Sequence, residues 1–95
     1  MKVLVSKLVF IIPYSSSLKD KRNIIRAIKD RVWSKFRASI SEVEEQNSIQ
    51  RAVLGLVYVS NDSKLLESLL SKIIDMLETS FPGLIHDYEY YVETH

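Results

Sequence analysis

Basic side chains are concentrated in one segment of the chain, where their spacing suits contact with phosphate groups. Residues 19–37 contain eight Lys or Arg and two Asp, which gives a local charge of +6. Cations laid along one face of a helix are typical of a protein that follows an RNA backbone. The alternative is a solvated face whose charge is balanced by the protein's own acids or by an acidic partner. The candidate anion- or RNA-binding residues are Ser17, Lys19, Lys21, Arg22, Arg26 and Lys29.

Three of these cations, Lys19, Lys21 and Arg22, fall in the first turns of the expected helix. The helix dipole opposes a cation there by about 0.3–1 kcal/mol, and Asp20 offsets only one charge. One offset is pairing with the acids of the segment 42–45, Glu42, Glu44 and Glu45. We favour this pairing because the expected topology brings the acids to the same edge of the sheet. The other is an external anion held by helix-terminal N–H groups.

Composition limits the other chemistry open to this chain. Residues 42–95 carry three basic and ten acidic groups, a local −7, so the whole chain is only +1. With no cysteine, disulfides, thiolate metal sites and a cysteine nucleophile are excluded. His86 would point away from Asp87 and Glu89 in a strand, so we predict no metal site and no cofactor. We also find no nucleophile–base pair, which favours binding over catalysis.

Six elements must position these residues within a single domain, residues 1–95. Apolar runs, helical spacing and capping residues predict, in chain order, a strand over 2–12, a helix over 17–35, strands over 36–43 and 50–60, a helix from the 60–62 cap to about residue 80, and a strand over 84–92. The order βαββαβ predicts an α+β, ferredoxin-like sandwich. Its antiparallel strands lie in the order 4-1-3-2 with both helices on one face.

The two central strands are apolar on both faces, although only one face can meet the helices. Large exposed apolar patches are rare on monomers and usually mark an interface. We therefore predict a homodimer with an interface that includes Val5, Val9, Val53 and Val57. Stacking of two sheets and pairing of edge strands both remain open.

The aromatic residues of the last strand and of the first helix could either stack on nucleobases or pack against the protein. Tyr88 and Tyr90 share one face of the last strand and could form a platform on which bases stack. We favour a packing face instead, because Asp87 and Glu89 alternate with them. We expect Trp33, near the end of the first helix, to pack against the protein.

The N-terminal apolar run resembles a secretion signal only faintly. Lys7 interrupts it, and the serines at 15–17 do not provide a cleavage site of the usual small-residue pattern. We expect a buried strand in a cytoplasmic protein that does not enter a membrane.

Two short motifs resemble the signatures of the YlxP-like family of small bacterial proteins of unknown function. The first is the Ser-Leu-Lys-Asp-Lys-Arg run at 17–22, and the second is Gln-Arg-Ala-Val-Leu-Gly at 50–55, followed by Ser-Asn-Asp at 60–62. Ile49 stands where the family often carries a large aromatic residue. The resemblance implies a ferredoxin-like fold and, in many bacteria, a gene near those for translation initiation and transcription elongation factors. It implies no known reaction, and an association with RNA or the ribosome is the function that we favour. The alternative is a homo-oligomeric protein-interaction module.

Overall fold

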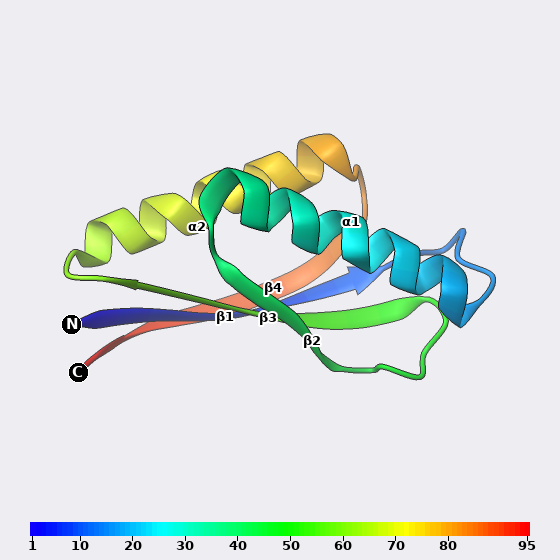
Figure 1. Ribbon diagram of the computed structural model, residues 1–95, viewed down its shortest axis with the longest axis horizontal. Helices are drawn as coiled ribbons and strands as arrows, with labels where there is room; N and C mark the ends of the chain where they lie inside the picture. Colours follow the sequence, from blue (N-terminus) through cyan, green and yellow to red (C-terminus); the bar gives the residue numbers. More distant parts are fainter.

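The computed structural model describes all 95 residues, and it confirms the predicted fold class (Figure 1). The elements are β1 (Lys2–Ile11), α1 (Leu18–Phe36), β2 (Ser39–Glu44), β3 (Arg51–Ser60), α2 (Ser63–Ser80) and β4 (Ile85–Thr94). The four antiparallel strands lie in the order β2-β3-β1-β4, which is the predicted 4-1-3-2 sheet. Both helices lie on one face of the sheet, and the two termini lie at the same end of the molecule.

The register of the central strands decides which residues face the helices. β1 pairs with β3 over ten positions, with Lys7 opposite Gly55, and with β4 on its other side. Since successive residues of a strand point to opposite faces, Leu4, Leu8 and Phe10 face the helices and are fully buried. The odd-numbered residues of β1 therefore lie on the other face, which we call the open face.

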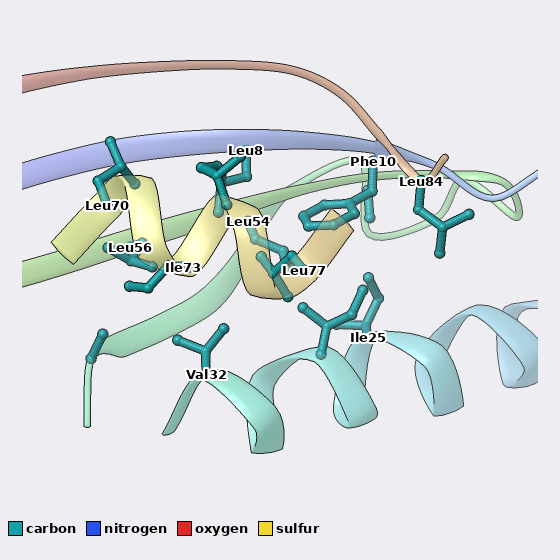
Figure 2. Close-up of a cluster of buried hydrophobic side chains, with 14 of the residues drawn as sticks. Leu8, Phe10, Ile25, Val32, Leu54, Leu56, Leu70, Ile73, Leu77 and Leu84 are labelled. Atoms are coloured by element: carbon teal, nitrogen blue, oxygen red, sulfur yellow. The ribbon is translucent and has the colours of Figure 1, made fainter. Parts of the chain in front are cut away.

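The hydrophobic core fills the layer between the helices and the sheet (Figure 2). α1 contributes Ile25 and Val32, while α2 contributes a stripe that includes Leu70, Ile73 and Leu77. Burying each such side chain stabilises the fold by about 1.5–3 kcal/mol. Neither helix combines the length and the apolar character that crossing a membrane requires.

The start of the second strand is the largest error in the predicted boundaries. Phe36, Ala38 and Ile40 alternate with polar residues, and this pattern predicted a strand from residue 36. In the structure Phe36 ends α1, Arg37 caps the helix in a left-handed conformation (φ 56°), and β2 begins at Ser39. A helix end followed by a strand places the same three side chains against the core, so alternation over so few residues did not distinguish the two.

Candidate nucleic-acid interface

Hydrogen bonds accepted by the side chains of Ser17 and Asp20 cap the N-terminus of α1. The Ser17 hydroxyl accepts a hydrogen bond from the Asp20 N–H at 3.0 Å, which is the first of the two bonds of a capping box. The Asp20 carboxylate reaches back to accept from the hydroxyl and the N–H of Ser16, at 2.6 and 3.1 Å. These bonds to Ser16 hold the pKa of Asp20 below its ordinary value. Ser17 is thus a helix cap, and we leave it out of the binding surface.

Lys21 lies in the core, with no exposed surface. Its ammonium donates hydrogen bonds to the carbonyl oxygens of Glu45, Gln46 and Arg51, at 2.8, 3.4 and 3.2 Å. The Glu42 carboxylate lies 3.0 Å from the same ammonium, although it takes no hydrogen bond of its own. The inclusion of Lys21 among the predicted phosphate contacts is therefore wrong. A buried ammonium needs such partners, and here it fixes the β2–β3 connection to α1.

A second set of bonds fixes the same connection to the loop after β1. The Gln50 side-chain amide donates to the carbonyl oxygens of Pro13 and Ser15, at 3.1 and 3.2 Å. The backbone carbonyl of Gln50 accepts from the N–H of Ile12 at 2.7 Å. Lys21 and Gln50 together hold the hairpin against the start of α1 and so fix the position of the helix.

The remaining cations of α1 divide between its two flanks. Lys19, Arg22, Arg26 and Lys29 follow one another at steps of three or four residues, which places them in one line along the helix. Trp33 continues this line at a further step of four, and Arg37, which follows the last helical residue, joins the line because its guanidinium lies over the Trp33 ring. We call the five cations of this line the basic ridge: Lys19, Arg22, Arg26, Lys29 and Arg37. All are exposed except Lys29, which is half-buried.

No acid of the protein pairs with the basic ridge. The three ion pairs are Lys7–Glu44, Lys21–Glu42 and His95–Glu93. Of the predicted pairings with the hairpin acids, only Lys21–Glu42 forms. A register shift between Glu42 and Glu44 turns Glu44 toward the open face, where it contacts Lys7 at 2.6 Å. Arg31, on the other flank of α1, donates to the Ser80 hydroxyl at 3.2 Å.

Trp33 does not pack as we expected. Its side chain is 52% exposed, and the Arg37 guanidinium lies over its ring, 5.2 Å from the centroid. The left-handed conformation of Arg37 turns the chain back at the end of the helix, where its N–H donates to the Trp33 carbonyl at 2.9 Å. An exposed aromatic ring therefore stands within the line of cations.

Comparison with known proteins agrees with the two signature motifs. The family described as "Protein of unknown function (DUF503)" matches residues 3–90. The chain belongs to the DUF503 family. Protein YlxP of Bacillus subtilis (strain 168), itself uncharacterised, is 38% identical over 70 residues, which cover 74% of this chain and 75% of YlxP.

Solved structures similar to this DUF503 protein support the fold alone. The designed protein LFR1 1, which has a ferredoxin fold, gives a TM-score of 0.57 at 13% identity and covers all of this chain, with 87% of its own length matched. A mutant of SnoaB, a cofactor-independent oxygenase from Streptomyces nogalater, gives 0.54 at 11% identity, over 99% of this chain and 92% of SnoaB.

The valines predicted to form an oligomer interface all lie on the open face, but they differ in exposure. Val57 is 40% exposed, while Val5 and Val9 are half-buried. Val53 is only 6% exposed, so it offers no surface to a partner, and its place in the predicted interface is wrong. The apolar end of this face lies where the chain termini meet, and it carries Val3, Val5, Val57, Val59 and Tyr91.

The aromatic face of β4 borders a hollow along α2. Tyr88 and Tyr90 line it together with side chains of α2 such as Lys64, Leu70 and Ile74. Both rings remain close to half exposed, so they cover the edge of the core only in part. No three His, Asp or Glu side chains come together as a metal site would require.

The sequence indicates that Lys21 is buried, but a count of charges over the segment does not show it. Lys21 precedes Ile25, Ile28 and Val32 at steps of four, three and four residues, so it occupies the apolar stripe of α1. The exposure of Trp33 had a similar signal, because it lies in line with Arg22, Arg26 and Lys29 instead.

Proposed function

We propose that this protein is a non-enzymatic RNA-binding module that contacts a phosphate backbone through the basic ridge of α1. The observation that carries the proposal is the lack of any acidic partner for the five ridge cations. A protein that balanced these charges internally would place the nearby glutamates against them, and β2 directs Glu42 and Glu44 to other lysines.

The ridge is a regular row of cations along the helix. Residues three or four apart on a helix are separated by roughly 4.5–6 Å along its axis, and the line from Lys19 to Trp33, over whose ring Arg37 lies, extends over about 21 Å. Cations that neutralise phosphates release condensed counterions, which makes affinity strongly dependent on salt. Lys19 and Arg22 also lie at or next to the first turn of α1, where the helix dipole disfavours cations, and phosphate contacts would offset that cost.

The test is RNA binding measured by fluorescence anisotropy with a labelled single-stranded RNA. Five contacts predict that affinity falls roughly 100-fold between about 50 and 200 mM salt, since each contact contributes about 0.7 to the salt slope. Arg26→Glu with Lys29→Glu should abolish binding and keep the fold. The matched control is Arg31→Glu with Lys35→Glu, which makes the same change of charge on the other flank of α1 and should retain most of the affinity at 150 mM salt.

Free RNA and ribosomal RNA offer the same phosphate chemistry, so a second measurement is needed to distinguish these two partners. Co-sedimentation with purified ribosomal subunits at 150 mM salt, lost in the Arg26→Glu/Lys29→Glu variant, would place the partner on the ribosome. Absence of RNA binding even at low salt would overturn the proposal in both forms.

A second candidate function, self-association, is supported by the apolar end of the open face. Val57, Val59 and Tyr91 are 40–55% exposed there, with no helix to cover them. A four-stranded sheet is about 19 Å wide, and ten residues of strand are about 33 Å long. The whole open face thus measures roughly 600 Å², of which the apolar end is about half, whereas a standard interface buries roughly 800 Å² per partner. We propose a two-fold dimer in which the two apolar ends stack.

Sedimentation equilibrium at tens of micromolar tests this dimer. Val57→Glu should yield a folded monomer of 11.0 kDa, the mass of one chain. Leu65→Glu is the control, because it charges an equally exposed apolar residue of α2, away from the open face. A monomeric wild-type protein at these concentrations would contradict the dimer and leave the RNA proposal untouched.

A further inference from the structure

A hollow beside Trp33 interrupts the surface between the end of α1 and the start of β2. Its volume is about 240 Å³, and it is lined by Lys29, Asp30, Trp33, Ala38, Ser39 and Ile40. This is just below the roughly 300 Å³ at which small-molecule pockets usually begin. The hollow therefore suits one flat ring system better than a larger ligand.

Three features of the hollow point to the class of ligand. Trp33 supplies an aromatic surface. Proteins that bind single-stranded nucleic acid stack the bases on exposed aromatic rings of this kind. Asp30 supplies a carboxylate, which repels phosphate but accepts hydrogen bonds from base amino groups such as N4 of cytosine. Lys29, on the same hollow, belongs to the basic ridge and can hold the phosphate that adjoins such a base.

We propose that the Trp33 hollow binds one unpaired nucleobase of the RNA whose backbone follows the basic ridge. This inference rests on the proposed RNA-binding function and narrows it to single strands. Bases in an A-form duplex are stacked inside and their faces are not accessible, whereas unpaired bases can be turned outward onto aromatic side chains. Arg37 and Lys29 lie on either side of Trp33 in the ridge, so phosphates can be held on both sides of the bound base.

The test uses the intrinsic fluorescence of Trp33, which is the only tryptophan in the chain. The probes are a single-stranded RNA of twelve nucleotides rich in cytosine, the same sequence as a duplex, and inorganic polyphosphate of similar charge. Polyphosphate offers the charge of the backbone without bases. The single strand should quench the tryptophan emission as it binds, while the duplex and polyphosphate should bind without comparable quenching.

The variant Trp33→Leu should lower the affinity for the single strand about tenfold, the usual loss for one base–aromatic stack. It should change the affinity for polyphosphate by less than about twofold, because all five ridge cations are retained and only Arg37 loses its contact with the ring. Tyr88→Leu is the matched control, because it removes a ring of similar exposure, 44%, on the opposite edge of the sheet, and it should leave both affinities unchanged.

The outcomes separate this inference from the function on which it rests. Single-stranded RNA that binds Trp33→Leu as tightly as wild type, or that binds wild type without quenching, overturns the nucleobase site and leaves the ridge standing. Failure of wild type to bind any of the three probes at low salt overturns the proposed function itself.

Discussion

Lys21 and Arg22 are neighbours in the sequence, yet they belong to two regions of α1 that use charge in opposite ways. Lys21 is buried among three carbonyl oxygens and one carboxylate. Arg22 is exposed, and no acid of the protein pairs with it. One step along a helix turns a side chain by about 100°. The position of a lysine or arginine around the helix axis therefore decides whether its charge is buried or exposed. Counting charge over a segment therefore overstates a binding surface, because it adds structural cations to available ones.

The largest effect expected from this comparison is the loss of stability in Lys21→Met. The substitution leaves Glu42, whose side chain is 18% exposed, without its counter-charge and removes the donor to three carbonyls. Removing one partner of a buried ion pair usually costs about 3–5 kcal/mol. Urea unfolding followed by circular dichroism should show a reduction of that size in the free energy of unfolding.

Lys19→Met is the control for Lys21→Met, because it makes the same change two residues earlier on the exposed ridge. Its free energy of unfolding should stay within about 0.5 kcal/mol of wild type, while its affinity for RNA falls. If Lys21→Met were as stable as Lys19→Met, the contrast between the two regions would be wrong.

A smaller loss is expected for Ser17→Ala, which removes the cap of α1. The Asp20 N–H then loses its acceptor, and such replacements typically cost about 1 kcal/mol. Thermal unfolding should show a lowered Tm with RNA affinity unchanged at temperatures where the variant is folded. A tenfold loss of RNA affinity in this variant would instead return Ser17 to the binding surface.

Asp20 makes the stability of the cap depend on pH. Its pKa is lowered in the folded protein by the bonds from Ser16, relative to an ordinary value of 3.8. Its contribution is therefore present above about pH 3.8 and is lost as the pH falls through the lower pKa of the folded state. The difference in unfolding free energy between wild type and Asp20→Asn should be constant near neutrality and shrink below that pH. A difference that stays constant down to pH 2 would contradict the role of the ionised carboxylate.

An effect on stability as small as that of Lys19→Met is expected for Arg37→Gly. Glycine removes the cost of a left-handed residue, about 1 kcal/mol, but it also loses the contact with Trp33, about 0.5–1 kcal/mol. The free energy of unfolding should change by less than about 0.5 kcal/mol, since glycine also gains freedom in the unfolded chain. RNA affinity should nevertheless become less dependent on salt. A destabilisation of several kcal/mol would show that Arg37, like Lys21, has a structural role and does not belong to the basic ridge.

The sequence predicted the order of elements and the strand order well, because long apolar runs and caps such as Asp62 are local signals. It predicted less of the candidate site, because the site depends on contacts between distant segments. The partners of Lys21 are backbone carbonyls of the hairpin, and a carbonyl has no signature in a sequence. Likewise, the register shift between Glu42 and Glu44 follows from strand pairing, which the alternation of residues does not reveal. Because of this shift, Glu44 does not pair with the ridge cations as predicted.

The most direct test of the central claim, that the exposed ridge and not the buried lysine contacts phosphate, is the slope of log affinity against log salt concentration. It should be measured with one single-stranded RNA for wild type and for a variant with glutamine at Lys19, Arg22, Arg26 and Lys29. We predict a steep negative slope for wild type, reduced in magnitude by about 3 in the variant, since each lost phosphate contact removes about 0.7. An unchanged slope in the folded variant would contradict the account, because the phosphate contacts would then lie elsewhere on the protein.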